Sequence, residues 1–119
     1  MTTLIACLGA GKGTWSYVIE LIAKEEWEKI FLITNSFGKE KFMIKKDNIE
    51  FIVVDESQTL VSMVNDISAK LKGKISGFEV AVNIISGTGK EHMAVISAVL
   101  KLGVAMRLVG VDKDGIKEI

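Results

Sequence analysis

The chain has 119 residues, of which 49% are hydrophobic and 25% are charged, and its fifteen basic residues balance its fifteen acidic ones. This length fits one domain over residues 1–119 with a single core, and a chain without net positive charge is a poor candidate for sequence-independent binding to duplex DNA. One cysteine and one histidine exclude an internal disulfide and a cysteine-rich zinc site. We expect neither a metal nor a cofactor.

The beginning of the chain is apolar but short. Its apolar run stops at Gly9, too early for a secretory signal, and no run elsewhere approaches the roughly 20 residues of a membrane-spanning helix. We therefore expect a cytoplasmic protein with no membrane partner.

Apolar segments of strand length recur along the chain. β-branched and aromatic residues dominate them with little alternation, which is typical of strands buried on both faces of a parallel sheet. The five predicted strands are Thr3–Leu8, Lys29–Thr34, Glu50–Val54, Glu79–Ile85 and Ala105–Val111.

Three of the longer segments between these strands place apolar residues three and four positions apart, which predicts amphipathic helices. The predicted helices are Thr14–Glu26, Ser57–Leu71 and Lys90–Leu102. Gly73 and Gly103 stand where the last two should end. The lysine-rich segment Ser36–Asp47 is weakly periodic and predicts either a short helix or a loop.

The alternation of strands and helices predicts an α/β fold with right-handed crossovers. We expect a minimal five-stranded, mostly parallel, Rossmann-like doubly wound sheet in the order 3-2-1-4-5, with helices on both faces. Ligands of such folds bind beyond the carboxyl ends of the strands, where the strand order reverses. In this order the first and fourth strands are neighbours, so the loops that follow them should face each other across one pocket.

Both of those loops are rich in glycine and hydroxyl groups. They are Gly9-Ala10-Gly11-Lys12-Gly13-Thr14 and Ser86-Gly87-Thr88-Gly89-Lys90. Glycines let backbone N–H groups approach an anion, the following helix adds its positive N-terminal end, and Lys12 and Lys90 each add a cation. We therefore expect a site for a phosphate-bearing or otherwise polar ligand. The alternative is that the glycines only form tight turns and the lysines face water.

Other candidate residues carry weaker signals. Asn35, Ser36 and Phe37 follow the second predicted strand and are candidates to recognise a base, although an ordinary polar turn is the favoured interpretation. His92 is either an acid–base group or an ordinary residue of the first helical turn. Residues 55–57 are expected to lead into the next helix, with the serine of this segment as its N-cap.

The first loop does not fit two common nucleotide-binding motifs. A P-loop requires a glycine where Ala6 stands, and a nucleoside monophosphate kinase needs several arginines, whereas the chain has only Arg107. The dinucleotide motif requires a third glycine at the position of Thr14 and an acidic residue at the end of the second strand, where Thr34 and Asn35 stand. A conventional NAD site is therefore not expected.

The two loops together resemble those of CARF domains, the Rossmann-like ligand sensors of CRISPR-associated proteins. The residues that carry the resemblance are Leu8-Gly9-Ala10-Gly11 with Trp15 and Tyr17, and Asn83-Ile84-Ile85-Ser86-Gly87-Thr88-Gly89-Lys90 with Met93. The resemblance covers the whole chain as a minimal domain. One departure is Thr88, which separates Gly87 from Gly89 where the family usually has adjacent glycines.

This resemblance implies a homodimer that binds a cyclic oligoadenylate across its twofold axis in CRISPR antiviral defence signalling. Some stand-alone members cleave the ring without a metal, through attack of a ribose 2′-hydroxyl on its own phosphodiester. For such a ring nuclease, Lys90 is the first candidate to stabilise the charge on phosphorus and Lys12 the second, with Ser86 or Thr88 positioning the phosphate.

The resemblance leaves open whether the chain cleaves the ligand or only binds it and signals through a separate effector protein. Two other interpretations also stay open. One is a mononucleotide- or dinucleotide-binding domain of another lineage, and the other is a non-catalytic assembly module.

Overall fold

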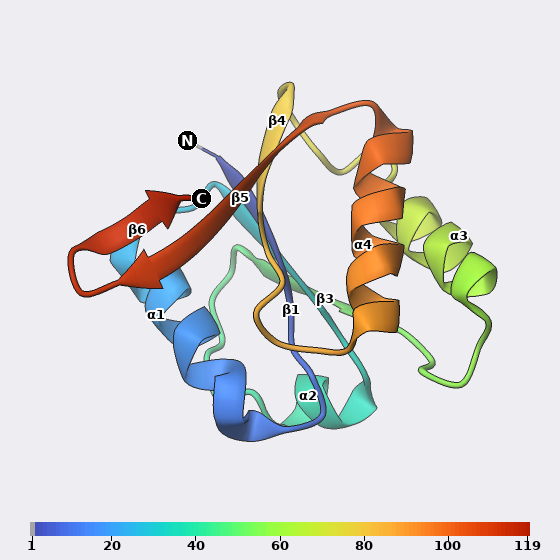
Figure 1. Ribbon diagram of the computed structural model, residues 1–119, viewed down its shortest axis with the longest axis horizontal. Coiled ribbons are helices and arrows are strands. Elements are labelled where there is room, and N and C mark those ends of the chain that lie inside the picture. Colours follow the sequence, from blue (N-terminus) through green and yellow to red (C-terminus); the bar gives the residue numbers. More distant parts are fainter. Residues whose placement is uncertain (1) are drawn as a thin grey trace.

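The computed structural model describes residues 2–119 as an α/β fold built on one six-stranded sheet. The strands are β1 (Thr3–Cys7), β2 (Lys29–Thr34), β3 (Ile49–Val53), β4 (Glu79–Asn83), β5 (Ala105–Asp112) and β6 (Gly115–Glu118). Their order across the sheet is β3-β2-β1-β4-β5-β6, as Figure 1 shows. The first five strands pair in parallel. The predicted order of these strands is therefore confirmed, and their predicted ends are correct to within two residues.

The prediction of five strands is wrong, because the end of the chain adds β6. This strand pairs antiparallel with β5, from Val109 opposite Glu118 to Asp112 opposite Gly115. Gly115 has a φ of +114°, a conformation that favours glycine. β6 is short and half polar at the edge of the sheet, so it has no apolar run to mark it. The Asp114-Gly115 pair, a common hairpin turn, was the available signal.

The helices are α1 (Trp15–Lys24), α2 (Ser36–Lys41), α3 (Leu60–Leu71) and α4 (Gly89–Leu102), with a short 3₁₀ turn, η1 (Lys12–Thr14), before α1. The N-cap of α3 is Thr59, not the predicted Ser57. The reason is that the backbone N–H and hydroxyl of Ser57 both donate to the carboxylate of Asp55. α4 ends as predicted at Gly103, whose φ is +77°. Within residues 2–119, no helix has the length and apolar character needed to cross a bilayer.

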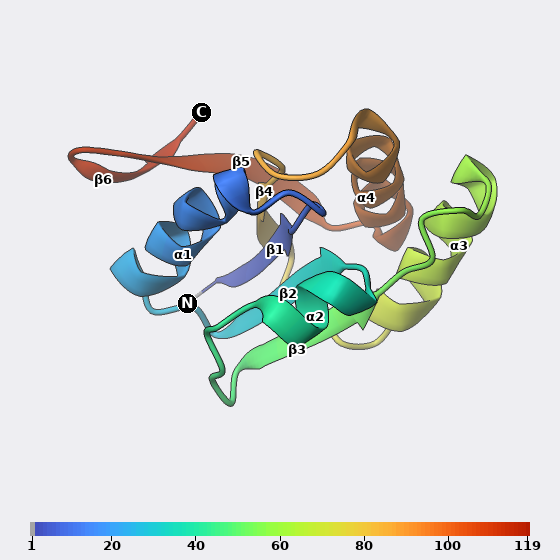
Figure 2. The same cartoon turned by 90° about the horizontal axis from the view of Figure 1, so that it is seen from below.

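Helices cover both faces of the sheet, as expected. Leu4 and Ala6 of β1 pack with Trp15 of α1 on one face, whereas Ile5 and Cys7 pack toward α3 and α4 on the other. Figure 2 shows α1 on one side of the sheet and α3 and α4 on the opposite side. Burial of both faces explains why β1 is a continuous apolar run.

The carboxyl ends of the parallel strands meet at one edge of the sheet, the lower edge in Figure 1. β1 pairs directly with β4, although the two strands are far apart in the sequence. The β1–α1 loop and the β4–α4 loop therefore leave the sheet from neighbouring strands, at the point where the strand order reverses.

Candidate functional site

The two glycine-rich loops contact each other through their backbones. The N–H of Gly9 donates a buried hydrogen bond to the Ser86 hydroxyl, with a distance of 2.8 Å between N and Oγ. A Cβ atom on Gly9 would lie only 2.7 Å from the nitrogen of Gly87 and 2.9 Å from its Cα. This close approach requires glycine at position 9. Gly87 has a φ of +106°, so glycine is also favoured at position 87.

A cleft of about 340 Å³ lies between the loops. It is lined by Gly9, Ala10, Gly11, Gly13, Thr14, Glu56, Gly87 and Thr88. All of these except Glu56 are predicted ligand-binding residues, so the fold brings most of the predicted site together. Backbone from glycines of both loops, with the α1 and α4 N-termini behind it, is suited to binding an anion.

The β4–α4 loop is held by its own side chains. Thr88 and Glu91 form a capping box, in which the Thr88 N–H donates to Glu91 Oε1 at 2.9 Å and the Glu91 N–H donates to Thr88 Oγ1 at 3.3 Å. Nε2 of His92 lies 2.9 Å from the carbonyl oxygen of Ser86. The Ser86 hydroxyl and the His92 ring therefore contact the backbone of the loops, and neither side chain lines the cleft.

The two candidate lysines lie in different surroundings. Nζ of Lys90 donates to the backbone carbonyls of Glu56, at 3.0 Å, and Gln58. It thus ties the start of α4 to the β3–α3 loop. Lys12 is exposed, its Nζ lies 5.8 Å from the centroid of the Phe37 ring, and it takes part in none of the ion pairs found among residues 2–119. Lys12 is the cation with fewer competing partners.

The remaining predicted residues do not line the cleft. Gly89 begins α4. Asn35 and Ser36 line a separate cavity at the ends of β2 and β3. The Asn35 side-chain oxygen accepts from the Gly38 N–H at 2.8 Å, so Asn35 is the N-cap of α2, and Ser36 and Phe37 begin this helix.

Sequence analysis missed Glu56 as a residue of this site. It was expected only to lead into the next helix, but it lines the cleft between the loops, and Nδ2 of Asn35 donates to its Oε1 at 2.5 Å. The available signal was its position directly after a buried strand, at the same edge of the sheet as the two loops.

Two buried side chains, Trp15 and Cys7, lie next to the first loop. The indole N–H of Trp15 donates to the carbonyl oxygen of Gly9 at 3.0 Å, and the side chain is buried in the core on the α1 face of the sheet. Cys7 is buried at the end of β1, and burial raises the pKa of its thiol to about 12. The thiol is therefore protonated at neutral pH and acts as a small apolar group.

The groups at this edge are glycine backbone, the hydroxyl of Thr14, the carboxylate of Glu56 and, on the first loop, the exposed ammonium group of Lys12. Within the part of the chain that the structure describes, no group of three or more His, Cys, Asp and Glu side chains could hold a metal ion. Neither a protein-family profile nor a curated protein matches the chain, so any functional assignment depends on these residues themselves.

Proposed function

We propose that the chain is a CARF-like sensor that binds a cyclic oligoadenylate across a homodimer in CRISPR defence signalling, in the cytoplasm. The observation that carries the proposal is the direct contact between the β1–α1 and β4–α4 loops, with a cleft between them, on neighbouring strands. A phosphodiester in this cleft would meet the glycine backbone of both loops, with Lys12 beside it. This is the arrangement that the resemblance to CARF domains requires.

An uncovered apolar surface beside the second loop supports the homodimer. Tyr17, Ile85, Leu108 and Ile119 are each at least 40% exposed and line one cavity of about 370 Å³. Ile85 directly precedes Ser86 in the second loop. A second copy that covers this surface would bring its own loops close to those of the first, and a symmetric ring matches such a twofold site.

Oligomeric state tests this part of the proposal. Ile85→Lys places a charge on the proposed interface and should convert a dimer into a monomer in light scattering. Met43→Lys is the matched control, because Met43 is 86% exposed but does not line this cavity. A wild-type protein that is monomeric with and without ligand contradicts the proposed homodimer.

Lys12 takes precedence over Lys90 as the phosphate-binding cation in this proposal. Lys90 would first have to leave the carbonyl oxygens of Glu56 and Gln58. In a cleavage step, the ribose 2′-hydroxyl gives up its proton, its oxygen bonds to phosphorus, and the bond from phosphorus to the 5′-oxygen breaks as that oxygen takes up a proton. A lysine ammonium group stabilises the charge on the phosphoryl oxygens during this step.

Binding is tested first by thermal unfolding with cyclic tri-, tetra- and hexa-adenylate, with ATP and NAD alongside. A ligand at a hundred times its dissociation constant stabilises the protein by about 2.7 kcal/mol. Lys12→Ala should weaken binding of the stabilising ring by about tenfold or more, the value of one charge-assisted hydrogen bond. Lys24→Ala is the control, because Lys24 pairs with Glu20 on α1 at 3.6 Å.

Each result of this panel has a different meaning. Stabilisation by one ring size supports the proposal and names the substrate for a cleavage assay by chromatography, in which Lys12→Ala and Lys90→Ala are compared. Stabilisation by ATP or NAD alone favours a nucleotide-binding domain of another lineage. No effect of any compound favours a non-catalytic assembly module and refutes the proposed sensor.

A further inference from the structure

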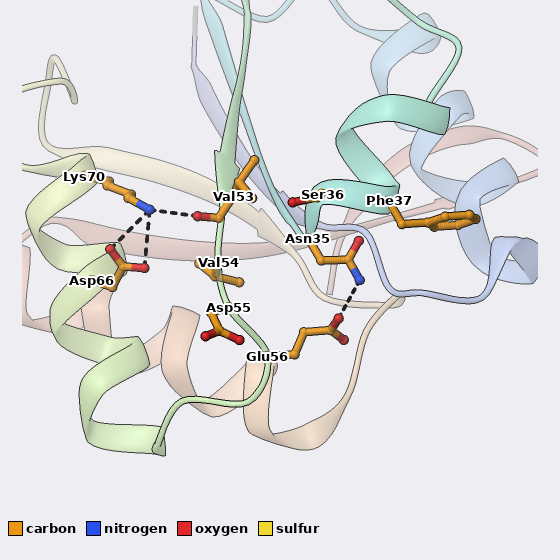
Figure 3. A pocket seen from close by; sticks show the side chains of 9 residues that line it. All are labelled: Asn35, Ser36, Phe37, Val53, Val54, Asp55, Glu56, Asp66 and Lys70. Carbon is orange, nitrogen blue, oxygen red and sulfur yellow. Dashed lines mark hydrogen bonds and ion pairs between the residues drawn. The ribbon is translucent and has the colours of Figure 1, made fainter.

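A second cavity lies beside the glycine loops, at the carboxyl ends of β2 and β3. Its volume is about 600 Å³, larger than the cleft between the loops. It is lined by Asn35, Ser36, Phe37, Val53, Val54, Asp55, Glu56, Asp66 and Lys70, and Figure 3 shows these side chains. Glu56 lines both the cavity and the cleft. One ligand can therefore extend from the cleft into the cavity past this residue.

The charged groups of the cavity favour hydrogen-bond donors over phosphate. Lys70 is the one cation among its described lining residues, and its Nζ is held by Asp66 at 3.2 Å and by the carbonyl oxygen of Val53 at 2.7 Å. The carboxylates of Asp55 and Glu56 are exposed at the other side. An anion would meet three carboxylates and one ammonium group among the described lining residues, whereas hydroxyl or amino groups would find acceptors.

The carboxylate of Glu56 is oriented by Asn35. The Asn35 amide oxygen accepts the N–H of Gly38 at 2.8 Å, so its nitrogen must face away from that helix. This nitrogen donates to Oε1 of Glu56 at 2.5 Å; Figure 3 shows the two side chains pointing toward each other. One carboxylate oxygen, Oε1, is thus held by Asn35. Among residues 2–119, the other oxygen accepts no hydrogen bond and is available to a ligand.

A carboxylate at the carboxyl end of the second strand has a known binding role in folds of this class. In doubly wound folds, a carboxylate at the end of the second strand binds the hydroxyls of the ribose whose phosphate lies at the first loop. The sequence has Asn35 at that position, but the fold brings Glu56 to it from the loop after β3. The carboxylate that the sequence lacks after β2 is therefore supplied by Glu56, from the loop after the neighbouring strand β3.

We propose that Glu56, positioned by Asn35, binds a ribose hydroxyl of the nucleotide whose phosphate is held between the two glycine loops. This inference rests on the proposed function, since it requires a nucleotide in the cleft. It adds that the ligand is read as a ribonucleotide, so that loss of the ribose hydroxyl weakens binding.

The test compares ligands with and without that hydroxyl. The probes are the cyclic tri-, tetra- and hexa-adenylates, each with its all-2′-deoxy counterpart, and ATP with 2′,3′-dideoxy-ATP as a further pair. Wild-type protein should bind the ribose form of the bound pair about tenfold more tightly, the value of a hydrogen bond to a charged group. Glu56→Gln and Glu56→Ala should lose this preference by weakening the ribose form alone. Glu20→Gln, on the surface of α1, is the matched control.

The outcomes separate this inference from the proposed function. If the wild type binds a probe but prefers neither form, or if both Glu56 variants keep the wild-type preference, Glu56 is not a ribose ligand while nucleotide binding stands. If the wild type binds none of these probes, both proposals are refuted. Unfolding temperatures of the Glu56 variants should equal that of the wild type, because the side chain is exposed.

Discussion

The contact between the two glycine loops predicts a large effect of one methyl group. In Gly9→Ala, the new Cβ would lie 2.7 Å and 2.9 Å from two backbone atoms of Gly87 and 3.3 Å from the Ser86 Oγ. Backbone cannot move aside as the end of a flexible side chain can, so the loops must separate. Overpacking of this kind costs about 1–3 kcal/mol. Loss of the buried hydrogen bond from Gly9 to Ser86 adds about 1 kcal/mol.

We therefore expect Gly9→Ala to lower the free energy of unfolding by about 2–4 kcal/mol. Urea denaturation measures this directly, and the unfolding temperature should fall by about 4 °C for each kcal/mol in a domain of this size. Gly11→Ala is the matched control. A Cβ at Gly11 meets nothing within 4 Å, and its φ of −84° is allowed to alanine, so this variant should equal the wild type or gain up to about 1 kcal/mol through the unfolded state.

Equal stability of Gly9→Ala and Gly11→Ala would refute the close contact between the loops. It would also remove the observation on which the proposed function rests, because the cleft depends on Gly9 lying against Gly87.

Three further predictions concern groups around the site. At pH 8, folded protein should react with a thiol reagent far more slowly than protein in urea, because burial raises the pKa of Cys7 from 9.0 to about 12. Rapid labelling of the folded protein would contradict this. Since the folded state resists ionisation of this thiol, the contribution of Cys7 to stability should be lost as the pH rises from about 9 toward 12. Thr88→Ala should lower the free energy of unfolding by about 1 kcal/mol through loss of the capping box with Glu91, whereas Thr88→Ser should keep most of the capping-box stabilisation. Equal stability of the two variants in calorimetry would contradict the capping box. Hydrogen bonds from the hydroxyl and the backbone N–H of Ser57 hold the pKa of the Asp55 carboxyl below its ordinary value. Ser57→Ala removes the hydroxyl bond and should raise that pKa, and an NMR titration in which it does not move would show that the hydroxyl bond is absent in solution.

Much of the fold was accessible from local pattern, for a physical reason that β1 illustrates. A strand buried on both faces needs apolar side chains at every position, so Thr3–Cys7 stands out without any alignment. β6 did not stand out, because an edge strand of four residues with two exposed charged side chains needs no such run. Its presence depends on hydrogen bonding to β5, a tertiary property that only the Asp114-Gly115 turn hinted at.

The candidate site was likewise predictable from the sequence only in part. Glycine, hydroxyl and lysine residues at Gly9–Thr14 and Ser86–Lys90 are visible in the sequence, and the predicted strand order brings the two loops together. The partner of each side chain is not visible. Lys90 was the first choice as the catalytic cation, but two backbone carbonyls 32 and 34 residues away hold its ammonium group.

What the sequence determined by itself is the first five strands, the three long helices, the order of those strands in the parallel sheet, and the edge at which the two glycine-rich loops meet, because burial and backbone geometry impose residue types locally. What only the tertiary structure decided is which groups at that edge are free and which are engaged. Glu56 reaches the site from the loop after β3, and its carboxylate meets Asn35 across 21 residues of sequence. Contacts of this kind depend on the packing of separate strands and leave no periodic signal along the chain.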